Sequence, residues 1–251
     1  MRLAFRFRVI PFVATVVLVV LGIVLGNWQT RRAQDKLSIA ARLVERGAQA
    51  PLVLGDGGAA SRHVRVESGL HPAGIEYRRV RLTGEWVKDW PLFLDNRPLD
   101  GRAGFILAMP FKIAGSDKHV LVLRGWLPRD ANDYARLPGF ETPAGTVNIE
   151  GVATLSAGHV MQLGSAGELK PGMRVQNLEV DTVAKASGLA LEPFFVQQAG
   201  QGEGLVRDWP APETGVDKHR GYAFQWYALA AMAALFFVIT GFRSGRKQGG
   251  A

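Results

Sequence analysis

Histidine is the side chain best suited to bind a metal ion in this chain, because the sequence contains no cysteine. One histidine, His219, lies two residues before a long apolar segment. On a helix, His219, Tyr222 and Trp226 follow the spacing i, i+3 and i+7 and share one face. An imidazole beside two aromatic rings at a membrane surface is suited to bind haem, a flat amphipathic ligand whose iron accepts a histidine nitrogen. The alternative is an aromatic belt with a histidine that reaches the water.

The sequence shows no clear signature of a further metal site or of catalysis. Four further histidines follow no metal-binding spacing and should be exposed or ordinarily hydrogen-bonded: His63, His71, His119 and His159. Neither the G-x-S-x-G motif of a nucleophile elbow nor a phosphate-binding P-loop is present. Asp95 and Asp100 flank a turn, and turn chemistry explains these carboxylates better than acid–base catalysis does. The sequence therefore favours a protein that is not an enzyme.

The distribution of charge argues against a nucleic-acid partner. The chain has 251 residues and a formal net charge of +8. Six basic residues lie in two terminal regions without acids, which leaves 24 basic residues against 22 acids between residues 27 and 220. A nucleic-acid groove would concentrate its charge within the folded domain. Basic residues beside apolar segments are instead typical of membrane anchors.

Two apolar segments are long enough to span a lipid bilayer, which takes about 20 residues for a hydrocarbon core of about 30 Å. We expect transmembrane helices over residues 9–29 and 221–242, with basic tails at 1–8 and 243–251. The first helix should continue beyond the membrane to about residue 46. The alternative for the first segment is a cleaved signal peptide. Gly22 and Gly26 suit the close approach of another helix, although glycine is also simply common in membrane helices.

Aromatic residues indicate how the two helices are oriented. Trp28 closes the first helix and Tyr222 opens the second, so both ends should lie on the side of the intervening domain. Basic residues near the helix ends are equally numerous on the two sides. Because long domains are translocated largely regardless of their charge, we expect cytoplasmic tails and an extracytoplasmic domain over residues 30–220. This places the chain in a bacterial cytoplasmic (inner) membrane with a periplasmic domain, or alternatively in a mitochondrial inner membrane.

The intervening domain has the pattern of a mainly antiparallel β structure. Strands are expected at short intervals, over residues 80–82, 104–113, 120–125, 146–155 and 194–198. Residues 114–118 have the composition of a hairpin loop. A short helix should be capped by Asp181, run through Ser187 and end at Gly188. The expected fold class is a membrane protein with two transmembrane helices that flank an antiparallel β barrel or sandwich with one or two short helices.

Four motifs stand in order along the chain: Gly26-Asn27-Trp28-Gln29, Glu76-Tyr77-Arg78-Arg79-Val80, Arg124-Gly125-Trp126-Leu127-Pro128-Arg129 and His219-Arg220-Gly221-Tyr222-Ala223-Phe224-Gln225-Trp226. They resemble the Gly-x-Trp-Gln, Glu-Tyr-Arg-x-Val, Arg-Gly-aromatic-aliphatic-Pro-Arg and His-x-x-Tyr-Ala-x-x-Trp elements of the surfeit locus protein family, the Surf/Shy assembly factors of cytochrome c oxidase. Each motif is modest alone. Four in this order, between two membrane helices, are specific and cover nearly the whole chain.

The resemblance implies an assembly factor, or chaperone, that helps to mature the large subunit of cytochrome c oxidase by delivery or insertion of haem a. His219 would supply an axial nitrogen to the haem iron, with Tyr222 and Trp226 packed near the porphyrin. The lipid bilayer and haem a synthase are the further partners that it implies. The alternative is a membrane-anchored scaffold that stabilises an oxidase subunit without binding haem.

Other motif residues are candidates for interaction, namely Trp28, Gln29, Arg124 and Arg129. An arginine could pair with the haem propionates, whereas a structural ion pair or a turn bond is the alternative for Arg124 and Arg129. The chain departs from the family pattern at positions 217, 220 and 225. At the first of these, the carboxylate of Asp217 could orient the imidazole of His219.

Overall fold

The computed structural model describes residues 5–55, 72–161, 167–209 and 215–246. The chain forms two compact units, one made of Met1–Arg42 with Ala211–Ala251 and the other of Leu43–Pro210. His63 and His71 lie outside the described residues, as do residues 1–4 and 247–251 of the predicted tails.

Two long helices build the first unit. Helix α1 spans Val9–Ala48 and helix α4 spans Val216–Arg246, and both are long and apolar enough to cross a membrane. The 40 residues of α1 extend over about 60 Å at 1.5 Å per residue, twice a hydrocarbon core of about 30 Å. The expected continuation of the first helix beyond residue 29 is therefore confirmed. Helix α4 begins before the apolar segment, so His219 is helical.

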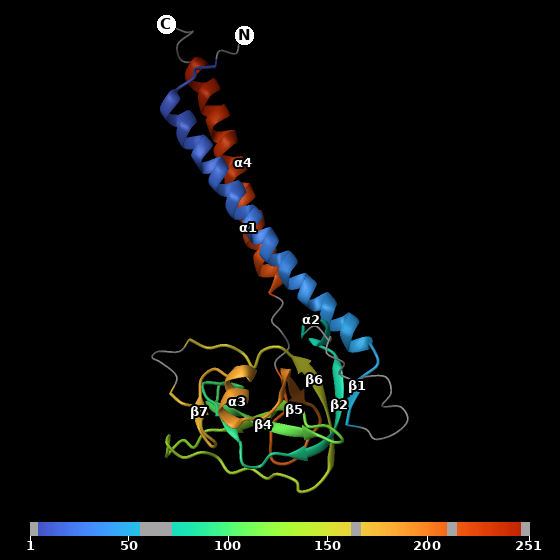
Figure 1. The fold of residues 1–251 in the computed structure, drawn as a ribbon. Coiled ribbons are helices and arrows are strands. Elements are labelled where there is room, and N and C mark those ends of the chain that lie inside the picture. Colours follow the sequence, from blue (N-terminus) through green and yellow to red (C-terminus); the bar gives the residue numbers. More distant parts are fainter. Residues whose placement is uncertain (1–4, 56–71, 162–166, 210–214, 247–251) are drawn as a thin grey trace. The chain divides into compact units, whose positions relative to one another are not determined.

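Helices α1 and α4 pack side by side through glycine (Figure 1). A Cβ atom on Gly22 would lie 2.8 Å from the carbonyl oxygen of Trp226 and 2.9 Å from the Cβ of Ala230. A Cβ atom on Gly26 would lie 2.5 Å from the ring of Tyr227. Both glycines are buried. The predicted close approach of a second helix at this pair is confirmed, and the second helix is α4 of the same chain.

The far ends of the same two helices are also joined. The backbone N–H of Arg6 donates to the carbonyl oxygen of Gly241 at 3.1 Å. The ring of Phe5 packs edge-to-face on Phe237 and Phe242, with centroid distances of 5.9 and 5.2 Å. Contacts at both ends make the pair antiparallel along its described length.

The described residues of the second unit form eight strands and two short helices. The strands are β1 (Leu52–Leu54), β2 (Arg79–Trp86), β3 (Leu92–Leu94), β4 (Gly104–Ile113), β5 (His119–Pro128), β6 (Val147–Thr154), β7 (Arg174–Val175) and β8 (Leu191–Gln198). The short helices are α2 (Pro72–Ile75) and α3 (Val180–Ser187). The expected hairpin joins β4 to β5, and each predicted strand matches one of the five longer strands.

Five of these strands close into a barrel. The hydrogen-bonded order runs β2–β6–β8–β5–β4, and β4 pairs again with β2 to complete the ring. Gly84 lies in the closing pair, where a Cβ atom would collide with the carbonyl oxygen of Lys112. Strands β3 and β7 extend the sheet beyond β4, and β1 lies beside β2. Most strand pairings are antiparallel, so the expected fold class is confirmed. Of the two expected forms, barrel and sandwich, the chain forms the barrel.

Burial explains the sequence pattern of the strands. Along β2 buried and less buried residues alternate, with Val80, Leu82 and Trp86 in the barrel core. Strand β5 is buried at nine of its ten positions. One of its faces contributes Val122 to the barrel core, while its other face packs Leu123 in a second cluster under α3. Because both faces of β5 are covered, its sequence is a nearly continuous apolar run.

One local expectation was wrong. Helix α3 begins at Val180 after Glu179 as N-cap, and the cap residue makes no side-chain hydrogen bond to the helix. Asp181 therefore lies inside the first turn instead of capping it, where its charge still favours the positive end of the helix dipole. The predicted end at Gly188 is correct, because this residue adopts a left-handed conformation with φ of 71°.

Enlarging Gly22 should weaken the helix pair. Gly22→Leu forces α4 away from its backbone contact, and we expect a loss of about 1–3 kcal/mol in the free energy of unfolding. The measurement is an SDS titration in mixed micelles followed by circular dichroism. Gly221→Leu is the matched control, because a Cβ at Gly221 meets no atom within 4 Å. Equal losses for both variants would contradict close packing at Gly22.

Acid should destabilise the barrel through His119. This side chain is 9% exposed, and burial lowers its pKa, with the charge of Lys112 acting in the same direction and the backbone of Ala190 opposing the shift. Because the unfolded chain then binds a proton more readily, stability is lost as the pH falls below about 6.5. His119→Gln should flatten the pH dependence of the urea midpoint between neutral and mildly acidic pH. His159→Gln, at an exposed position, should leave it unchanged.

Candidate functional site

His219 lies in the first turns of α4 and faces α1. Its Nδ1 atom is 2.7 Å from the Oε1 atom of Gln29, which comes from α1 190 residues earlier. Both side chains are half-buried. The other ring nitrogen, Nε2, has no hydrogen-bond partner among the residues that the structure describes. Within the described residues, the site therefore presents an imidazole with Nδ1 in contact with Gln29 and Nε2 without a partner.

A second set of polar contacts joins the helices next to His219. The hydroxyl of Tyr227 donates to Oδ1 of Asn27 at 2.8 Å, and Oγ1 of Thr30 lies 3.4 Å from the same hydroxyl. Sequence reasoning missed Asn27 and Thr30. Their only signal was a group of polar residues at the end of an apolar helix. These bonds and the Gln29–His219 contact align the two helices where their apolar segments end.

The predicted aromatic neighbours of His219 lie on the same helix but in different surroundings. Trp226 is half-buried and lines an apolar groove of about 350 Å³ between the two helices, together with Leu21, Gly22 and Met232. Tyr222 is 54% exposed. The structure thus brings Trp226 against α1 and leaves Tyr222 at the surface of α4. Both rings remain near the helix end that carries His219.

Trp28 lies on the outer surface of α1. Its side chain is 48% exposed, and the guanidinium of Arg32 stands 5.9 Å from its ring centroid. An exposed tryptophan with a neighbouring cation is typical of a residue at the boundary between lipid headgroups and water. Trp28 has no contact with His219 in the described interactions, so it is separate from the Gln29–His219 pair.

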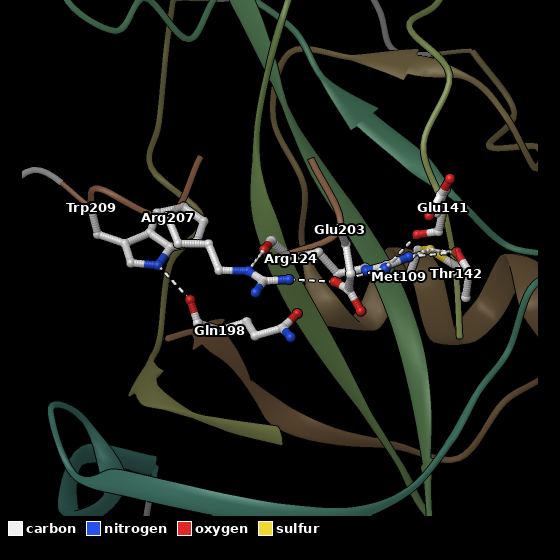
Figure 2. Close-up of polar contacts among 8 residues, drawn as sticks. All are labelled: Met109, Arg124, Glu141, Thr142, Gln198, Glu203, Arg207 and Trp209. Atoms are coloured by element: carbon white, nitrogen blue, oxygen red, sulfur yellow. Dashed lines mark hydrogen bonds and ion pairs between the residues drawn. The ribbon is translucent and has the colours of Figure 1, made fainter. Parts of the chain in front are cut away.

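Arg124 is buried in the barrel unit, with no exposed surface. Figure 2 shows its polar contacts. Its guanidinium donates to Oγ1 of Thr142 at 2.6 Å and to the carbonyl oxygen of Glu141 at 2.8 Å. It pairs with the carboxylate of Glu203 at 3.0 Å and stacks 4.4 Å from the ring centroid of Trp86. Burial lowers the pKa of Arg124, while the hydrogen bond and charge of Glu203 act in the opposite direction. These contacts are those of a structural ion pair, and the side chain has no surface to offer a ligand.

The segment after β8 folds back over Arg124. Arg207 pairs with Glu203 and donates from Nε to the carbonyl oxygen of Arg124 at 2.7 Å, as Figure 2 shows. Gly125 admits this segment, since a Cβ there would lie 2.8 Å from the Cβ of Leu205. Trp209 then donates to the carbonyl oxygen of Gln198 at 2.8 Å. The segment after β8 that lies over Arg124 therefore explains the Arg-Gly-Trp motif.

Arg129 is also engaged within the barrel unit. It forms an ion pair with Asp95, and its guanidinium lies 4.8 Å from the ring centroid of Phe105. Asp95 additionally accepts a hydrogen bond from the backbone N–H of Asn96 at 2.6 Å, in keeping with the expected turn chemistry. An ion pair of this kind is the structural alternative that the sequence allowed for Arg129.

His219 is the residue at this site that could hold a haem iron. Neutral imidazole is a good ligand for iron, and the nitrogen left without a partner in the described residues is the one that can bind it. The apolar groove that begins at Trp226 suits a flat hydrophobic ring. Among the described residues, no group of three or more histidine, aspartate or glutamate side chains could hold a metal ion. Within the described parts of the chain, His219 would therefore be a single ligand to the iron.

Comparison with known proteins points to one family. The family model described as "SURF1 family" matches residues 16–231. A SURF1-like protein of Rickettsia bellii is 23% identical over 224 residues, which is 86% of this chain and 85% of that protein. A SURF1-like protein of Monosiga brevicollis is 23% identical over 239 residues, 90% of this chain and 85% of that protein. The cytochrome oxidase assembly protein SHY1 of Saccharomyces cerevisiae is 26% identical over 114 residues, 44% of this chain and 26% of that protein.

The buried ion pair between Arg124 and Glu203 should contribute far more to the free energy of unfolding than an exposed ion pair does. Glu203→Gln removes the countercharge of Arg124, and breaking a buried pair in this way costs about 3–5 kcal/mol in the free energy of unfolding. The matched control is Glu150→Gln, whose pair with Arg81 is more than half exposed and worth about 0–1 kcal/mol. Urea unfolding of the detergent-solubilised chain, followed by tryptophan fluorescence, measures both. Similar midpoints for the two variants would contradict the structural role of Glu203.

Proposed function

The chain belongs to the SURF1 family, and on that premise we propose that it assists the assembly of a cytochrome oxidase in a membrane. The match over residues 16–231 carries this proposal, because it covers most of α1, the whole barrel unit and about the first half of α4. The name of the yeast relative states this role for that protein. Such a role is that of a chaperone and not of an enzyme.

The membrane placement follows from the two long helices. Their apolar segments would cross the lipid bilayer as an antiparallel pair, with the barrel unit on one side and the basic tails on the other. We place the tails in the bacterial cytoplasm and the barrel in the periplasm, because short basic tails are retained more readily than long domains. The Gln29–His219 contact would then lie at the periplasmic surface of the bilayer.

The cargo that we assign to the site is haem a, on its way to the large oxidase subunit. His219 would bind the iron through Nε2, since Nδ1 is engaged by Gln29. Trp226 and Tyr222 would pack against the porphyrin, one from the groove and the other from the helix surface. A single ligand holds haem more weakly than two, which suits a protein that must release its cargo. Haem a synthase is the expected donor.

A scaffold that does not bind haem is the second candidate. One observation favours it: a hydrogen bond between Gln29 and His219 is also what a purely structural contact between two helices provides. In that case the protein would hold the oxidase subunit in the membrane during its maturation, and His219 would serve only to align α1 with α4.

Replacing His219 distinguishes the two functions. The full-length protein is co-expressed with haem a synthesis and purified in detergent, and the visible spectrum and the extracted haem per chain are measured. We expect near-stoichiometric haem in the unchanged protein and in His159→Ala, an exposed control, and loss of haem in His219→Ala. The reason is that His219 offers an imidazole nitrogen to the iron about two helical turns from the apolar groove that Trp226 lines.

The other outcomes each exclude one assignment. Folded protein without haem in any sample would overturn the haem cargo and leave the scaffold. Equal haem in His219→Ala and the unchanged protein would mean that haem binds elsewhere. In a strain that lacks the gene, failure of the unchanged protein to increase assembled oxidase would contradict the assembly role itself. Restored assembly by His219→Ala would favour the scaffold.

A further inference from the structure

We propose that Gln29 is the positioning residue of the site: its amide oxygen holds the Nδ1–H of His219 and thereby leaves Nε2 as the nitrogen that a ligand meets. The effect of this contact on haem binding rests on the proposed function. The hydrogen bond and the tautomer it selects are properties of the protein without haem.

The geometry of the contact determines the tautomer. We infer the tautomer from the acceptor: a carbonyl oxygen only accepts hydrogen bonds, so Oε1 of Gln29 at 2.7 Å bonds to Nδ1 of neutral His219 in the form that carries the hydrogen there. In neutral imidazole the other nitrogen then has the free lone pair. An exposed histidine in water prefers the opposite tautomer. The contact therefore selects a form that the free side chain adopts less often.

The surrounding packing keeps Gln29 in place. On α1, the nearby Gly26 lets the helices approach closely, and Asn27 is bonded to Tyr227 of α4. These contacts lie within one turn of Gln29 and restrict rotation and sliding of α1 against α4. The amide therefore meets the imidazole with little freedom, as required of a residue that orients a ligand.

The orienting partner differs from Asp217, the candidate that the sequence offered for this role. Asp217 lies two residues before His219 and is exposed, whereas the partner of Nδ1 is Gln29 from the other helix. The two partners also differ in chemistry, because Asp217 carries a carboxylate and Gln29 a neutral amide. A carboxylate partner raises the basicity of an iron-bound imidazole, and a neutral amide does so less. The structure therefore assigns a weaker ligand, which suits transfer of the cargo.

The test begins with haem-free protein. The full-length chain is labelled with ¹⁵N-histidine, placed in lipid nanodiscs at mildly alkaline pH, and examined by long-range proton–nitrogen correlation, which distinguishes the two tautomers. The signals of His219 are identified by their absence in His219→Ala. We expect the Nδ1–H tautomer in the unchanged protein and a shift towards the Nε2–H tautomer in Gln29→Met.

Two further variants act as controls. Gln34→Met changes an exposed glutamine on the same helix and should leave the His219 signals unchanged. Gln29→Glu retains an acceptor and should retain the Nδ1–H tautomer, which shows that a change in Gln29→Met comes from the lost acceptor. Circular dichroism checks that each variant keeps its helices.

Haem titration then tests the consequence. Loss of an orienting partner typically weakens metal binding about 10–100-fold, so Gln29→Met should bind haemin more weakly by this factor while Gln29→Glu binds it more tightly. An Nε2–H tautomer in the unchanged protein, or the same tautomer in Gln29→Met, would overturn the proposal. So would a changed tautomer with unchanged haemin affinity. The expected tautomers without any haemin binding would support the orienting role of Gln29 and overturn only the haem-binding function.

Discussion

The close approach of α1 and α4 at Gly22 and Gly26 is the constraint on which the candidate site depends. Because neither glycine has a side chain, the backbone and ring atoms of α4 can lie where a Cβ would otherwise be. At this separation, the short side chain of Asn27 reaches Tyr227, and Gln29 reaches His219. With bulkier residues at the two glycines, these polar side chains would be too far apart to bond directly.

The barrel unit depends on a different kind of interaction. Its closed ring leaves room for Arg124, whose charge is held by Glu203, Thr142 and the ring of Trp86. A buried charge is expensive unless it is paired and hydrogen-bonded, so this cluster ties the segment after β8 firmly to β5. That segment precedes α4 in the sequence. Contacts that stabilise the fold thus explain the motif around Arg124, whereas the motif around His219 contains the candidate ligand-binding site.

Long elements of the fold were predictable from local patterns, and short ones were not. Strand β4 has the bounds expected for it, because its ten residues form one apolar run that ends at a hairpin loop. Strands β1, β3 and β7 have only two or three residues, too few to reveal a period. They exist because β2 offers a backbone partner to β1, β4 offers one to β3, and β3 in turn offers one to β7. The choice of barrel over sandwich likewise depended on one pairing, between β2 and β4.

The sequence by itself determined two apolar helices, a β domain between them and a histidine on the face shared with Trp226, because hydrophobic period and helical spacing are local properties. Only the tertiary structure decided which residues meet across the chain. Gln29 and His219 are 190 positions apart, and Arg124 in β5 pairs with Glu203 in the segment after β8. No local period encodes such pairs. They follow from how glycine contacts and strand pairings bring distant segments together, which is a property of the whole packed chain.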